Sequence, residues 1–113
     1  MRIDYKSGVI VVAMLFVMML IAPLRSRADE SATLFNESCG SCHGQDGSAN
    51  TPGGKKLHAA NLRSKPVQSQ SDQQLYDSIA TGKQHKNYPH AFLYKGMTEK
   101  QIRGLVAHIR SFK

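Results

Sequence analysis

Cysteine is scarce in this chain, since Cys39 and Cys42 are the only two among 113 residues. A structural zinc site usually takes four ligands, so a lone pair would need two of the five histidines at unusual spacing. A thioredoxin-like thiol pair lies in a strand-helix-strand context, and no alternating apolar strand precedes Cys39. A disulfide across two intervening residues would constrain the unfolded chain only weakly. The cysteine content therefore argues against these three uses.

A long apolar run is also lacking. The run from Val9 to Ile21 has thirteen residues, whereas a membrane-spanning helix needs about twenty. Pro23 ends it, and Arg25 and Arg27 on the far side oppose the positive-inside rule. An uncleaved membrane anchor is therefore only the second interpretation of this segment.

The first interpretation is a signal peptide over residues 1–28. Arg2 and Lys6 form a basic start, and Ser26-Arg27-Ala28 places small residues at both positions that a signal peptidase reads. We predict cleavage after Ala28, which leaves residues 29–113 as one small domain and lowers the net charge from +7 to +4. Nucleic acid binding is not expected, because the chain is exported and its basic residues are not clustered on one helix.

The pentapeptide Cys39-Gly40-Ser41-Cys42-His43 combines two thiols with an imidazole. Its spacing suits the two vinyl groups of one haem, to which the sulfurs add as thioethers, and the histidine then falls beneath the ring. The motif predicts one covalently attached haem c per chain, held by Cys39 and Cys42, with His43 as the proximal iron ligand. A domain this small has a thin core, and the haem would form part of it.

The rest of the pattern predicts an all-α fold of three main helices and long loops wrapped around the haem. We expect Ser31 to cap the first helix and residues 44–70, rich in Gly, Ser, Asn and Gln, to form an irregular loop. Capping boxes at residues 71–74 and 98–101 open the other two helices, and Gly82 closes the second. The apolar faces of these helices are Leu75, Tyr76 and Ile79, followed by Ile102, Leu105, Val106, Ile109 and Phe112.

Taken together, these motifs resemble a small class I c-type cytochrome of the bacterial monohaem kind. Residues 34–44 are similar to the first helix and haem site of that family, and residues 98–112 to its last helix. Ser31 stands where the family often has glycine, and His108 where it often has an aromatic residue. We therefore expect a different contact where the first and last helices cross.

The sixth iron ligand is the departure from the family that matters for function. The family's methionine usually lies about eight residues before the cap of the last helix, and the residue eight before Thr98 is His90. His90 is thus the first candidate for the distal ligand. Met97, the only methionine beyond residue 28, is the second, and His85 or an open site is the remaining alternative.

The other histidines and aromatic residues have simpler interpretations. We expect His58 and His85 to be solvated and His108 to pack beside the apolar stripe. Three aromatic residues are expected to line the haem pocket: Tyr88, Phe92 and Tyr94.

The resemblance implies a periplasmic one-electron carrier, a monomer and not an enzyme, that shuttles between larger redox proteins. Loop lysines near the haem edge would steer it toward an acidic partner, the alternative being scattered solubilising charge. These are Lys55, Lys56, Lys65, Lys83, Lys86 and Lys95. Membrane contact, on the outer face of the cytoplasmic membrane, is expected only if residues 1–28 are retained. The alternative functions are a haem-based sensor with an open sixth position and a thiol-disulfide oxidoreductase.

Overall fold

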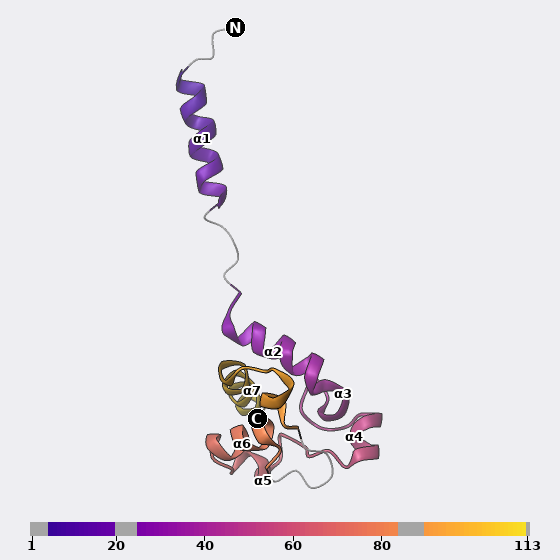
Figure 1. Cartoon of the computed structure of the whole chain (residues 1–113). Helices are drawn as coiled ribbons and strands as arrows, with labels where there is room; N and C mark the ends of the chain where they lie inside the picture. The colour runs from indigo at the N-terminus through magenta and orange to yellow at the C-terminus, as the bar shows by residue number, and fades with distance from the viewer. Residues whose placement is uncertain (1–4, 20–24, 84–89, 113) are drawn as a thin grey trace.

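The computed structural model describes residues 5–19, 25–83 and 90–112, and every regular element in those ranges is a helix. This confirms the expected all-α class. The elements are α1 (Tyr5–Met19), α2 (Arg27–Ser38), α3 (Gly40–His43), α4 (Pro52–Leu57), α5 (Lys65–Gln68), α6 (Asp72–Thr81), the 3-10 helix η1 (Phe92–Lys95) and α7 (Glu99–Ser111). Figure 1 shows α2 to α7 gathered in one body, with α1 apart from them.

The three expected main helices are α2, α6 and α7. Both predicted capping boxes are confirmed, because Ser71 and Thr98 each accept a hydrogen bond from the backbone of the residue three positions on, and Gln74 and Gln101 accept one in return. Gly82 closes α6 in the left-handed conformation at φ 74°. These local signals were sufficient to predict where both helices start and where α6 ends.

The start of α2 differs from the prediction. Its N-cap is Ser26, whose hydroxyl oxygen accepts a hydrogen bond from the Asp29 amide at 3.3 Å, so the expectation that Ser31 caps this helix was wrong. Asp29 and Glu30 then occupy the first turn, where carboxylates interact favourably with the helix dipole. Ala28 lies in the same turn, and the cleavage site after it stays a prediction.

The core forms where α2 and α6 pack against α7. Phe35, Ile102 and Leu105 are its largest fully buried side chains. Ser31 of α2 lies against Gly104 of α7. A methyl group added at Gly104 would overlap the Ser31 hydroxyl. The helices can therefore approach closely at this point, because α7 presents no side chain there.

His108 packs in the same crossing, as expected. Its ring centre lies 5.0 Å from that of Phe35 and 4.9 Å from that of Phe112. The His108 imidazole thus takes part in an aromatic cluster where α2 and α7 cross.

The segment 44–70 is more ordered than predicted, since it contains α4 and α5. Thr51 caps α4 with Pro52 at the first helical position, a start signal that the expectation of an irregular loop missed. The side-chain amide of Gln68, in α5, donates hydrogen bonds to the carbonyl oxygens of Leu62 at 2.7 Å and Ile109 at 3.0 Å. This segment is therefore tied to α7 across the sequence.

α1 coincides with most of the predicted apolar run. The side chains of Val9, Val12 and Met14 are more than half exposed. Of the helices that the structure describes, none has the length and apolar character needed to cross a membrane.

Candidate functional site

The two thiols and the first imidazole lie on one turn of backbone. Cys39 ends α2 and also precedes α3, and its amide donates to the carbonyl oxygen of Phe35 at 2.8 Å. The His43 amide donates to the carbonyl oxygen of Cys39 at 2.9 Å. Residues four apart on a helical turn share a face, so Cys39 and His43 are directed to the same side.

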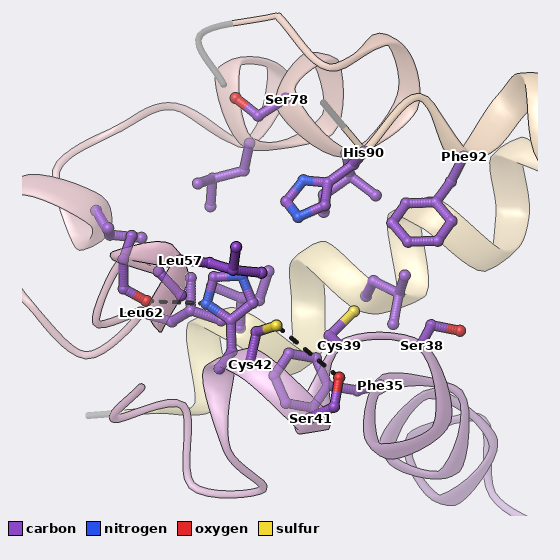
Figure 2. A pocket seen from close by; sticks show the side chains of 18 of the residues that line it. Phe35, Ser38, Cys39, Ser41, Cys42, Leu57, Leu62, Ser78, His90 and Phe92 are labelled. Atoms are coloured by element: carbon purple, nitrogen blue, oxygen red, sulfur yellow. Dashed lines mark hydrogen bonds between the residues drawn. The ribbon is translucent and has the colours of Figure 1, made fainter. Parts of the chain in front are cut away.

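A cavity of about 600 Å³ opens on that side. It is bordered by α2 and α3, by residues 57–62, by α6 and by the segment that carries His90. Figure 2 shows the sulfur atoms of Cys39 and Cys42 on one side of the cavity and His90 on the other. Such a volume is within the range that cofactor sites usually occupy.

His43 is buried, and its ring is fixed by a hydrogen bond. Nδ1–H donates to the carbonyl oxygen of Ala60 at 2.9 Å, because a carbonyl oxygen can only accept. Nε2 then keeps its lone pair, which is the form that binds a metal. Burial lowers the pKa of His43, and the Ala60 carbonyl partly offsets that effect, so the neutral ring is favoured.

His90 faces His43. The two ring centres are 6.0 Å apart, and the ring planes are inclined by 50°. A metal–nitrogen bond is about 2 Å long, and an imidazole nitrogen lies about 1.1 Å from its ring centre, so two imidazoles on opposite sides of one metal have centres about 6 Å apart. The observed separation therefore fits a single metal ion between the rings.

The donor set favours a metal whose other ligands are not protein side chains. Within the described ranges, no three His, Cys, Asp or Glu residues gather into a group that could hold a metal ion. A zinc site would need about four such donors. Two opposed imidazoles beside two thiols instead suit haem, which brings four equatorial nitrogens with its iron.

The Cys39 thiol is poorly ionised. Burial, together with the nearby Cys42, raises the pKa of the Cys39 thiol to about 11. Both cysteines are free in this structure. Because redox-active thiols have lowered pKa values, this environment argues against thiol-disulfide chemistry.

Of the other residues considered as ligands, Met97 and His58 lie in the described part of the chain. Met97 is half-buried against the core, its amide donates to the carbonyl oxygen of Phe92 at 3.1 Å, and it is not part of the cavity wall. His58 is exposed, as expected, although it also borders the cavity. His85 lies outside the described residues.

The expected aromatic wall is formed only in part. Phe92 lines the cavity, as predicted. Tyr94 does not, because its side chain is 83% exposed and η1 turns it outward, so that prediction was wrong. Tyr88 lies outside the described residues.

The lysines expected in loops at the haem edge lie partly in helices: Lys55 and Lys56 are in α4, Lys65 is in α5 and Lys95 is in η1. Lys95 borders the cavity, and Lys55, Lys56 and Lys65 are exposed. The Lys83 ammonium lies 3.9 Å from the Asp77 carboxylate, and Lys86 is outside the described residues.

Sequence reasoning missed two residues that support the site. Ala60 holds His43 through its backbone carbonyl, and no sequence pattern marks such a contact seventeen positions away. The Thr51 hydroxyl lies 2.9 Å from the carbonyl oxygen of Ser41 and 2.8 Å from that of Cys42, which ties α4 to α3. The Thr51-Pro52 pair was the available signal.

Of the comparisons with known proteins, a family model gives a match. A search among curated proteins found no match. The family model described as cytochrome c matches residues 28–113, which include α3 to α7, all of α2 except Arg27 and all the residues of the cavity. The chain therefore belongs to the cytochrome c family.

Proposed function

We propose that this protein is a periplasmic carrier of single electrons with one haem c per chain. Domains of the cytochrome c family are haem-based electron carriers, generally not enzymes, and are typically exported. The observation that supports the proposal most is the pair of imidazoles, His43 and His90, with ring centres 6.0 Å apart across a cavity bordered by two thiols.

Four residues would hold the group. Cys39 and Cys42 would bind it as thioethers, His43 would be the proximal ligand and His90 the distal ligand. When bound, haem supplies an iron that takes up and releases one electron.

The chain supplies orientation and shielding. The Ala60 carbonyl holds His43 in one tautomer, so its ring is oriented before the iron is bound. Apolar side chains, among them Leu62, Val67 and Leu75, line the cavity and limit the access of water. A site whose ligands are held in place reorganises little when an electron is transferred, which suits a carrier.

The first alternative is a sensor with an open sixth position. The place of His90 on the cavity wall opposite the cysteines argues against it, since this ring is close enough to His43 for both to bind one iron. The second alternative, a thiol oxidoreductase, is opposed by the raised pKa of Cys39.

The distal ligand is tested by comparing His90→Ala with Met97→Ala in haem-loaded protein. We expect the His90 variant to lose the six-coordinate low-spin spectrum and the Met97 variant to keep it. Two histidines also lower the reduction potential relative to a histidine and methionine pair. Loss of the low-spin spectrum only in the Met97 variant would overturn the assignment of His90.

The partners are proposed to be larger redox proteins with an acidic docking face. Lys95 borders the cavity, and the exposed Lys55 and Lys56 are on α4, whose last residue, Leu57, also borders it. These lysines support this choice. The protein is proposed to act as a monomer that transforms no substrate.

A further inference from the structure

His90 is stacked on a neighbouring aromatic ring. The ring centres of His90 and Phe92 are 5.5 Å apart, and their planes differ by only 23°. Ala91 between them adopts the left-handed conformation at φ 49° and ψ 42°, which is uncommon for a residue other than glycine. Figure 2 shows the two rings next to each other on the side of the cavity opposite the cysteines.

Phe92 is itself well held. It begins η1, and its carbonyl oxygen accepts the Met97 amide at 3.1 Å. Its ring packs against the hydrophobic core, and the Lys95 ammonium lies 4.9 Å from the ring centre. η1 also packs on α6. The phenyl ring therefore offers His90 a flat surface that is anchored in the fold.

We propose that Phe92 is a positioning residue for the distal imidazole. Its ring sets the plane of His90 and holds the imidazole toward the iron, as the Ala60 carbonyl orients His43. This inference rests on the proposed role of His90 as a ligand. It also explains the strained backbone at Ala91, since this conformation joins the two stacked residues.

The test replaces the flat phenyl ring of Phe92 by an apolar side chain that is not flat. In Phe92→Leu, His90 should leave the iron more readily, so carbon monoxide should bind the ferrous protein about threefold to tenfold faster, the factor that an aromatic pair is worth. The ferric low-spin paramagnetic resonance signal, which depends on the angle between the two ligand planes, should broaden or shift. Phe92→Tyr keeps a flat ring and should restore both properties.

Tyr94→Leu is the matched control, because Tyr94 is an aromatic residue of the same 3-10 helix but is 83% exposed. It should leave both measurements unchanged. If Phe92→Leu does not take up haem, Phe92→Met provides the same comparison with a different apolar side chain.

Two results would overturn the proposal. One is a Phe92→Leu protein with unchanged carbon monoxide binding and an unchanged resonance signal. The other is an equal change in Tyr94→Leu. Failure of the proposed function is distinguishable, since a histidine and methionine spectrum or a five-coordinate spectrum would already appear in the unsubstituted protein.

Discussion

At the scale of single residues, the two histidines with lowered pKa values have different neighbours. Burial lowers the pKa of both His43 and His108. His43 donates one ring hydrogen to Ala60 and can offer its other nitrogen to a metal. His108 lies between Phe35 and Phe112 and contributes packing. The residue type alone does not separate these uses, but the neighbours do.

We expect His108 to make folding sensitive to acid. Its pKa in the folded protein is below the ordinary value of 6.5, so the unfolded chain binds more protons and the free energy of unfolding falls as the pH drops below that value. In His108→Phe, the part of this pH dependence that comes from His108 should be absent, and the aromatic cluster should be kept. Urea unfolding of both haem-loaded proteins should show a difference in midpoint that widens between about pH 7.5 and about pH 5.5. A difference that stays constant with pH would contradict this role.

At the scale of elements, Gly54 and Gly104 each allow two segments of the chain to approach closely. A methyl group added at these two positions would overlap different kinds of atom. A methyl group at Gly104 would overlap the Ser31 hydroxyl, which can rotate away. A methyl group at Gly54 would overlap the backbone carbonyls of Cys42 and Ala49, which cannot. Gly54 is buried in α4, next to the turn that carries the cysteines.

Gly54→Ala should therefore be much more harmful than Gly104→Ala. We expect Gly54→Ala to lower the free energy of unfolding by about 1–3 kcal/mol, because α4 must move away from α3. Gly104→Ala should cost less than about 1 kcal/mol, since the higher helix propensity of alanine offsets the movement of Ser31. Denaturant unfolding of both variants measures the difference. Equal losses would show that α4 is not held closely against α3.

At the scale of the whole molecule, cleavage of the N-terminal segment would change both the net charge and the start of the folded body. The full chain has a net charge of +7, and cleavage after Ala28 would leave +4. It would also remove Ser26, the N-cap of α2. The folded body would then begin at Asp29, inside the first turn of that helix.

Mass spectrometry of the exported protein tests this boundary together with haem attachment. We expect a polypeptide that begins at Asp29 and carries one haem that survives acid extraction, because thioether bonds are covalent. A polypeptide that retains residues 1–28 would instead identify that segment as an anchor. Haem that is freely extracted would contradict attachment through Cys39 and Cys42.

Positive charge beside the cavity should accelerate electron exchange with anions. Lys56 is exposed and precedes Leu57, which borders the cavity. Lys56→Glu should therefore slow oxidation of the ferrous protein by hexacyanoferrate about threefold at low salt, because it weakens the attraction of an anion to this side of the protein. Lys100→Glu changes the charge equally on α7, away from the cavity wall, and should have a smaller effect. Stopped-flow rates measure both, and the difference should vanish at high salt. Equal slowing by the two variants would favour scattered solubilising charge.

The sequence by itself determined what depends on short spacings. The capping boxes at Ser71 and Thr98, the stop at Gly82 and the apolar stripe of α7 are local, because each involves residues only a few positions apart. The pentapeptide from Cys39 to His43 is local in the same sense. Ser26 and Thr51 are also local signals, but Ser31 is a second possible cap near the first, and the glycine-rich composition of residues 44–70 obscures the second.

Only the tertiary structure decided what depends on distant segments. It brought His90 to 6.0 Å from His43, directed the Ala60 carbonyl to the proximal ring, and placed Met97 in the core and Tyr94 in solvent. Spacing to Thr98 marked His90 as a candidate, but the distance between the two rings and the other three placements depend on packing between segments that are far apart in the sequence. Such contacts arise from packing and backbone hydrogen bonds, which join residues without any mark in their side-chain pattern.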